Sequence, residues 1–197
     1  IEVLDISNNK LSKIEFIPGT LKELSARHNN LKSIDCDLPN IIYIDCSENL
    51  LQVLKNYDTL VELDCSKNKI IYLPDYKNLQ ILICNENNIE KIGDYPNIYN
   101  IECDSNKVSE INSKNAINIY CNNNPIDSFS LRECNNLKIF ECRKTNITKF
   151  EYNETLIHLS CDYGPHVQIS KKYCINLKQI GNNNSEVNYV FDVLKKS

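Results

Sequence analysis

Residues 60–73 read LVELDCSKNKIIYL, and this stretch sets the pattern for most of the chain. If Leu60 is numbered place 1, apolar residues stand at places 1, 4, 6, 11 and 14, and Asn68 stands at place 9. Residues 79–92 (LQILICNENNIEKI) and 98–111 (IYNIECDSNKVSEI) repeat this spacing. The 197-residue chain is therefore built from an internal repeat whose units are 19 residues apart in this region.

The spacing predicts one short strand in each unit. Alternate residues of a strand point to opposite faces, so places 4 and 6 should enter a core while places 3 and 5 face outward. The Asn at place 9 can bond backbone groups that a turn leaves unpaired, and stacked units would align these amides in a ladder. Because a single unit cannot bury its own apolar residues, we expect successive units to stack into a solenoid.

The pattern resembles the leucine-rich repeat, L-x-x-L-x-L-x-x-N-x-L, with Cys in place of the third Leu. We identify a single domain over residues 1–197, in which residues 190–197 form a C-terminal cap. The resemblance implies a horseshoe-shaped repeat solenoid with a parallel β-sheet on its concave face, extended or 3₁₀ segments on its convex face, and little helix. The ten units begin at Ile1, Leu21, Ile41, Leu60, Leu79, Ile98, Ala116, Leu137, Leu156 and Leu177.

Two further resemblances concern the class and the source of the repeats. The short units, and the phrase IPGTLKELSARHNNL at residues 17–31, resemble the class of roughly 20-residue repeats known from secreted bacterial effectors. The composition, with 30 Asn among 197 residues and many Ile, Lys and Tyr, resembles that of leucine-rich repeat proteins of giant DNA viruses of amoebae. We therefore expect a viral protein.

Most of the ten Cys residues fall at equivalent places of the repeat. Seven stand at place 6, where the side chain should point into the core. Cys134 and Cys174 stand three residues before a unit start, where other units carry residues such as Tyr76, and they should also fill the core. Because the spacing does not match that of zinc ligands, we expect reduced, buried thiols and no metal or cofactor. The Cys residues at place 6 are Cys46, Cys65, Cys84, Cys103, Cys121, Cys142 and Cys161.

The chain contains no Met, and Ile1 already fills place 1 of the first unit. We therefore expect the native protein to extend further at its N-terminus, which leaves a secretory leader open. No apolar run of about 18 residues occurs, so we expect no membrane span. We expect a cytoplasmic protein, located in the host cytoplasm or the virion if it is viral. The glycosylation sequons at Asn146, Asn153 and Asn183 have meaning only if the protein is secreted.

Places 3, 5, 7 and 8 should form the solvent-exposed concave face, and acidic residues dominate them. Eleven acids and four bases give this face a charge of −7, whereas the whole chain carries −4. The acidity is therefore localised. The bases are Arg27, Lys67, Arg143 and Lys144, and the acids are Asp5, Glu23, Asp45, Glu48, Glu62, Asp64, Glu86, Glu102, Asp104, Glu141 and Asp162.

The middle of this face combines carboxylates with an apolar spot. Asp45 and Asp64 occupy the same place on adjacent predicted strands, about 4.8 Å apart, although like charges side by side cost stability. Ile81 and Ile83 occupy both central places of the fifth unit, and an apolar spot in a charged rim is typical of a protein interface. Acids that keep an open sheet soluble and a few scattered exposed hydrophobic residues are the alternative. The candidate binding residues are Tyr43, Asp45, Glu62, Asp64, Ile81, Ile83, Glu102, Asp104 and Tyr120.

Catalytic patterns are weak. His158, Ser160 and Asp162 alternate along one predicted strand, but residues i and i+2 lie roughly 6.5–7 Å apart, too far for the proton relay of a serine triad. The four Gly residues form no phosphate-binding loop. An acidic face also argues against nucleic acid. We therefore expect neither an enzyme nor a nucleic-acid or membrane partner.

Together these features predict a monomeric protein–protein interaction module that binds a basic protein through the concave face of units 3 to 7. The alternative is a structural or virion-associated repeat protein without a dedicated binding site.

Overall fold

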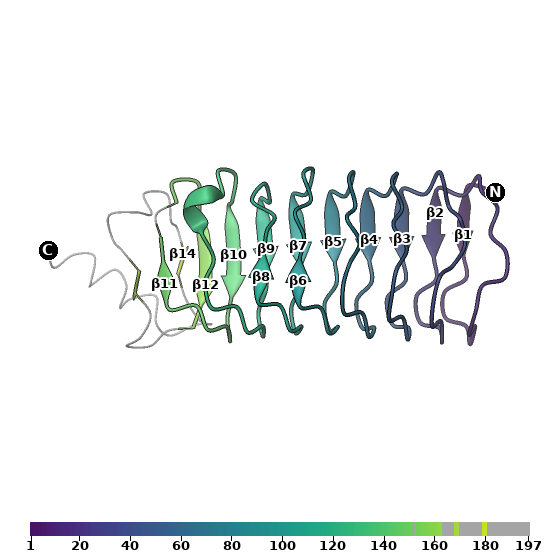
Figure 1. The fold of residues 1–197 in the computed structure, drawn as a ribbon, viewed down its shortest axis with the longest axis horizontal. Coiled ribbons are helices and arrows are strands. Elements are labelled where there is room, and N and C mark those ends of the chain that lie inside the picture. Colours follow the sequence, from purple (N-terminus) through teal and green to yellow (C-terminus); the bar gives the residue numbers. More distant parts are fainter. Residues whose placement is uncertain (152, 163–167, 170–178, 181–197) are drawn as a thin grey trace, which may run out of the picture.

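The computed structural model describes residues 1–151 and 153–162, together with the short segments 168–169 and 179–180. Within these residues, ten strands form one parallel sheet in sequence order, and the coils that carry them stack in a row starting from the N-terminus (Figure 1). The prediction of one parallel strand per unit is confirmed, and the architecture is that of a leucine-rich repeat solenoid.

Each strand of this sheet begins at place 3 of its unit. Adjacent strands align place against place, as Leu63 aligns with Leu82. Because the described strand pairs keep this register, equivalent residues form columns along the solenoid. The strands are β1 (Val3–Asp5), β2 (Glu23–Ser25), β3 (Tyr43–Asp45), β4 (Glu62–Asp64), β5 (Ile81–Ile83), β7 (Asn100–Glu102), β9 (Asn118–Tyr120), β10 (Ile139–Cys142), β12 (His158–Cys161) and β14 (Gln179–Ile180).

The opposite side of the coils contains little regular structure, as predicted. A single described helix is the 3₁₀ turn η1 (Leu131–Glu133), which lies in the segment between units 7 and 8. The unexpected feature is two short parallel strand pairs on this side. They are β6 (Lys91–Ile92) with β8 (Glu110–Ile111), and β11 (Lys149–Phe150) with β13 (Gln168–Ile169).

One of the three sequons is part of this outer structure. Asn153 is buried, and its amide nitrogen donates to the carbonyl oxygens of Leu131, the first residue of η1, and of Cys134, which follows its last residue, both at 2.7 Å. The folded protein therefore uses the Asn153 side chain as a helix cap and leaves no room for a glycan. Asn146 is exposed, and Asn183 lies outside the described residues.

Columns of Leu, Ile and Cys fill the core. All seven place-6 thiols are buried and free of disulfides, and so is Cys134, as predicted. Burial raises the pKa of the Cys84 thiol well above its ordinary value, which disfavours the reactive thiolate. Cys174 lies outside the described residues. A separate column contains Tyr57, Tyr76 and Tyr95, whose hydroxyls donate to carbonyl oxygens of the preceding unit.

The Asn residues at place 9 form the predicted ladder. The Asn49 amide nitrogen donates to the carbonyl oxygen of Cys46 in its own unit at 3.1 Å and to that of Ala26 in the preceding unit at 3.0 Å. Its Oδ1 accepts the Leu31 N–H at 2.9 Å. Each such side chain therefore joins two coils and satisfies three backbone groups. The same arrangement recurs at Asn29, Asn68, Asn87, Asn106 and Asn124.

A second set of Asn side chains joins the coils at the residue that precedes place 1. These amides donate to carbonyl oxygens of the preceding coil, for example from Asn78 to Asp58 at 2.7 Å. Asn recurs at this position in the sequence, but the repeat pattern alone does not indicate its role. The other members are Asn40, Asn97 and Asn115.

The residue at place 8 adopts a left-handed backbone conformation in units 1 to 8, with φ between 53° and 58°. Asn tolerates this conformation better than other non-Gly residues do. Units 1 and 7 carry Asn there and unit 2 carries His28, which is also enriched in this conformation, so the other five are the strained ones. They are Glu48, Lys67, Glu86, Ser105 and Lys144.

Replacing Asn87 by Ala should lower the free energy of unfolding by about 2–4 kcal/mol, because the Ile70 N–H and the Cys65 and Cys84 carbonyls would lose their partner in the core. Urea denaturation of the two proteins measures this difference. Asn88→Ala is the matched control, since Asn88 is the adjacent residue outside the ladder. Equal losses in the two variants would contradict the ladder's role.

Replacing Glu86 by Asn should raise the free energy of unfolding by about 0.5–1 kcal/mol, because Asn relieves the strain of the left-handed backbone. The control is Glu90→Asn, which removes the same charge from another exposed position of the same unit, without a positive φ. Thermal and urea unfolding should show a higher free energy of unfolding for Glu86→Asn alone. A similar increase for Glu90→Asn would show that the loss of a negative charge, and not the relief of backbone strain, stabilises the protein.

Candidate functional site

The predicted concave face has two parts that differ in charge. We call the outward side chains of places 3 and 5 the strand face, and those of places 7 and 8 the turn rim. Across units 1 to 9 the strand face contains seven acids and no Lys or Arg, whereas the turn rim contains four acids and four bases. The whole net charge of −7 therefore lies on the strand face. Its acids are Asp5, Glu23, Asp45, Glu62, Asp64, Glu102 and Glu141.

The apolar spot lies in the middle of this strand face. Ile81 and Ile83 are half-buried on β5, and Ile83 aligns with Asp64 on one side and Glu102 on the other, as predicted. Two tyrosines are also among the candidate binding residues. The structure places Tyr43 on β3 and Tyr120 on β9, two strands away from β5 in opposite directions.

The adjacent carboxylates Asp45 and Asp64 align across β3 and β4, and both also stabilise the turn. Asp45 Oδ1 accepts the Ser47 N–H at 3.0 Å, and Asp64 Oδ1 accepts the Ser66 N–H at 2.9 Å. Backbone bonds between coils use the N–H groups of places 6 and 8, which leaves the place-7 N–H without a carbonyl partner. The two carboxylates therefore have a structural role, which the sequence analysis missed.

In units 6 to 8, the place-7 side chain of the preceding unit satisfies the place-7 N–H. Asn85 Oδ1 accepts the Asp104 N–H at 2.8 Å, Asp104 Oδ1 accepts the Asn122 N–H at 2.6 Å, and Asn122 Oδ1 accepts the Arg143 N–H at 2.7 Å. The candidate residue Asp104 is thus one step in a chain of bonds that connects the coils. The sequence signal was the change from Ser to Asn or Asp at place 7.

Partial burial shapes the electrostatics of these carboxylates. Burial raises the pKa of Asp64, and the neighbouring Asp45 raises it further, although the bonds from Ser66 lower it. Burial is also the main cause of the raised pKa of Asp104. In both cases desolvation outweighs the hydrogen bonds, so ionisation of these two groups opposes folding.

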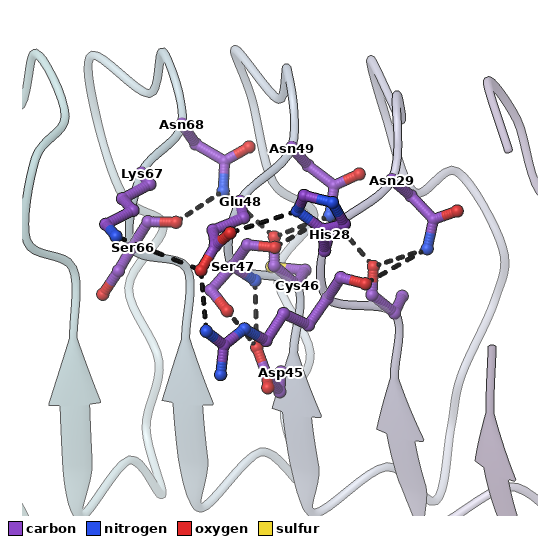
Figure 2. A network of polar contacts seen from close by, with 12 residues as sticks. His28, Asn29, Asp45, Cys46, Ser47, Glu48, Asn49, Ser66, Lys67 and Asn68 are labelled. Atoms are coloured by element: carbon purple, nitrogen blue, oxygen red, sulfur yellow. Dashed lines mark hydrogen bonds and ion pairs between the residues drawn. The ribbon is translucent and has the colours of Figure 1, made fainter. Parts of the chain in front are cut away.

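On the turn rim, Glu48 pairs with bases from both neighbouring coils (Figure 2). Its carboxylate lies 2.7 Å from Arg27 Nη2, 3.1 Å from His28 Nδ1 and 4.0 Å from Lys67 Nζ. Hydrogen bonds from Arg27 and His28 lower the pKa of Glu48. Since this acid is already neutralised, it adds little to the field that an approaching partner would meet.

The structure adds an exposed apolar row at place 2, one residue before each strand. Ile42, Tyr99 and Ile117 are about two-fifths exposed, at 41%, 39% and 38%. Val61 and Ile157 occupy the same place and are half-buried. This row was not predicted, because the repeat pattern leaves place 2 unspecified. The recurrence of apolar residues at place 2 is the sequence signal that could have revealed it.

His158 and Ser160 on β12, and Asp162 directly after it, each contact the preceding unit. His158 Nε2 lies 3.4 Å from Glu141 Oε1, and the Ser160 hydroxyl accepts the Arg143 Nε–H at 2.6 Å. Asp162 accepts the Lys144 N–H. The geometry therefore pairs these side chains between coils, as in the other units.

Within the part of the chain that the structure describes, no group of three or more His, Cys, Asp and Glu side chains is arranged to hold a metal ion. The same part contains no helix with the length and apolar character needed to cross a membrane.

Comparison with solved structures supports the fold. The functional domain of InlJ from Listeria monocytogenes, described as including a cysteine ladder, matches with a TM-score of 0.66 and 23% identity over 90% of this chain and 47% of that one. The leucine-rich repeat domain of APL1B matches with a TM-score of 0.73 and 23% identity over 91% of this chain and 59% of that one. These likenesses establish a leucine-rich repeat fold.

The chain spans between about half and three-fifths of the length of these two structures. At the level of sequence, no family model and no curated protein matches it. The bacterial-effector-like class and the viral source therefore stay predictions from the sequence.

Replacing Asp64 by Asn should stabilise the protein at neutral pH. The folded chain holds the Asp64 proton more tightly than the unfolded chain, so the associated stability is present below the ordinary pKa of 3.8 and is lost as pH rises through the folded pKa. Asn keeps an oxygen for the Ser66 N–H and does not ionise.

Urea denaturation between pH 3 and pH 7 should therefore show that Asp64→Asn has a higher free energy of unfolding than the wild type. This difference should grow with pH and vanish at pH 3. Asp127→Asn, which changes an exposed carboxylate outside this face, is the control. A gain that does not vary with pH would contradict the assignment.

Proposed function

We propose that this chain is a protein–protein interaction module whose strand face, from β3 to β9, binds a basic protein. The observation that supports this most is the composition of that face: from β3 to β9 it carries four acids, no Lys or Arg, and an apolar centre at Ile81 and Ile83. Interfaces commonly combine an apolar centre with a polar surround, and complementary charge selects the partner. The candidate residues Tyr43, Asp45, Glu62, Asp64, Glu102 and Tyr120 surround this centre on the strand face, and Asp104 lies beside it on the turn rim.

The two kinds of residue should contribute differently to binding. The carboxylates attract a positively charged partner over a distance, which mainly accelerates association and depends on salt. The isoleucines and tyrosines lose contact with water only in the complex, so they should mainly slow dissociation. Asp45 and Asp64 can therefore assist binding while they also satisfy the turn.

A partner recovered by affinity capture should bind variants of the strand face in two distinct ways. Ile83→Ala or Tyr120→Ala should raise the dissociation rate, with a loss of about 1–2 kcal/mol. Asp45→Asn combined with Asp64→Asn should slow association and flatten its salt dependence, while the turn bonds persist through the Asn oxygens. Surface plasmon resonance at several salt concentrations separates the two rates.

Tyr72→Ala is the matched control, because Tyr72 is an exposed aromatic residue at place 13, outside the strand face. Binding of the quadruple variant (Asp45→Asn, Asp64→Asn, Ile83→Ala, Tyr120→Ala) as tightly as the wild type would exclude the strand face as the site. Circular dichroism should confirm that each variant remains folded.

A further inference from the structure

The same arrangement of three side chains occurs twice on the strand face. Tyr43 on β3 aligns with Glu23 on β2 and with Glu62 on β4. Tyr120 on β9 aligns with Glu102 on β7 and with Glu141 on β10. Each tyrosine therefore stands between two glutamates on neighbouring strands. We call these the first and the second Glu–Tyr–Glu triplet.

We propose that each triplet is a subsite for a guanidinium group, so that the partner presents two Arg side chains to this face. The inference rests on the proposed function, since it specifies what a basic partner carries. It goes further because a diffuse acidic face would accept Lys as readily as Arg, whereas these triplets have a geometry that suits Arg.

The geometry combines an aromatic ring with carboxylates on both sides. Neighbouring strands lie about 4.8 Å apart, so both glutamates can reach a group that stacks on the ring between them. A guanidinium is planar, stacks on aromatic faces and presents five N–H donors in a fixed fork to carboxylates. An ammonium can be attracted to the same place, but it lacks the flat face and the fork.

The contacts already made by these residues leave room for a ligand. In the first triplet, within the described residues, neither the Glu23 nor the Glu62 side chain forms a hydrogen bond or ion pair. Both tyrosines are half-buried, and burial followed by the nearby carboxylates raises the pKa of each phenol. The tyrosines thus lie in a negative field, and the bases that approach the strand face, Arg27 and Arg143, reach it from the turn rim.

In the second triplet, other side chains hold the carboxylates from the flanks. Asn100 Nδ2 donates to Glu102 Oε1 at 3.2 Å, and His158 Nε2 lies 3.4 Å from Glu141 Oε1. Each contact involves the Oε1 oxygen of a glutamate. These contacts restrict the two carboxylates, which reduces the entropy lost when a guanidinium binds between them.

The two triplets flank the apolar spot symmetrically. The strand order β3-β4-β5-β7-β9 places the tyrosine strands four intervals apart, with Ile81 and Ile83 on the middle strand. The span is therefore roughly 20 Å. An extended peptide rises about 3.3 Å per residue and alternates its side chains, so residues i and i+6 can reach both triplets while i+2 and i+4 meet the isoleucines.

The peptide acetyl-Arg-Ser-Leu-Ser-Leu-Ser-Arg-amide has this spacing and serves as the probe. Titration into ¹⁵N-labelled protein at fixed salt, followed by NMR, gives the affinity and locates the contact. The matched peptide with Lys at both ends has the same charge and should bind about tenfold more weakly, since stacking at an exposed site contributes a factor of about 2–5 for each guanidinium.

Variants of the protein separate stacking from charge. Tyr43→Phe and Tyr120→Phe keep the aromatic ring and should change the affinity for the Arg peptide less than twofold. Tyr43→Ser combined with Tyr120→Ser keeps every carboxylate and should weaken the Arg peptide about tenfold, while leaving the Lys peptide nearly unchanged. Thermal unfolding identifies any variant that has lost its fold. If the Ser variant is unfolded, the affinities of the Phe variants for the Arg and Lys peptides are compared in its place.

Equal affinity for the Arg and Lys peptides, or no effect of the Ser substitutions, would overturn the guanidinium subsites. The proposed function would survive that result if the peptides still shift resonances of β3 to β9 and lose affinity on Glu62→Gln and Glu102→Gln. Shifts confined to residues outside these strands would overturn both the subsites and the strand face as the binding site.

Discussion

The stacking of the coils depends on hydrogen bonds to the backbone groups that each turn leaves unpaired. Most strands end at place 5, and backbone bonds between coils then continue through the N–H groups of places 6 and 8. In the described turns, the place-6 carbonyl and the place-11 N–H have no backbone partner. The Asn at place 9 satisfies three of them at once, in its own coil and in the preceding one. Buried polar groups without partners cost more than most single contacts contribute, so this requirement outweighs the preferences of neighbouring residues.

In the turn, residues with a strained backbone also carry charged side chains that form ion pairs between coils. The place-8 residue adopts a left-handed backbone even where it is Glu or Lys. At Glu48 the strained residue extends a carboxylate to bases on the coils before and after it. Exposed ion pairs are worth little individually, so they offset only part of such strain. The turn rim is thus held mainly by the backbone bonds of places 6 and 8 and by the Asn ladder.

The period of the fold could be predicted from sequence because the core demands it. Apolar residues at places 1, 4 and 6 repeat along the chain, and a one-residue shift would turn Leu63 or Leu82 out of the core. The roles of the outward polar residues could not be predicted in the same way. Whether Asp64 satisfies its own turn or Asn85 satisfies the next one depends on the direction in which the place-7 N–H points, which only the stacked coils define.

In the candidate site too, some features could be predicted from the sequence and others could not. The alignment of Asp45 with Asp64 and of Ile83 with Glu102 followed from the repeat alone, since equivalent places stack. The separation of charge into an acidic strand face and a balanced turn rim required knowledge of where the strand ends. The exposed place-2 row, with Ile42 and Tyr99, was missed because its exposure depends on how the coil enters the strand.

Thr145 occupies place 9 in the eighth unit, and its hydroxyl donates to the Cys142 carbonyl oxygen of its own coil at 2.8 Å. The Asn residues of the earlier units reach back to the preceding coil, whereas this shorter side chain does so neither as donor nor as acceptor in the described bonds. The junction between units 7 and 8 therefore lacks the ladder bonds, although the Arg143 N–H still bonds Asn122 Oδ1 across it. In a solenoid each coil contacts only its neighbours, so this loss falls on one junction and leaves the ladder of the first seven coils intact.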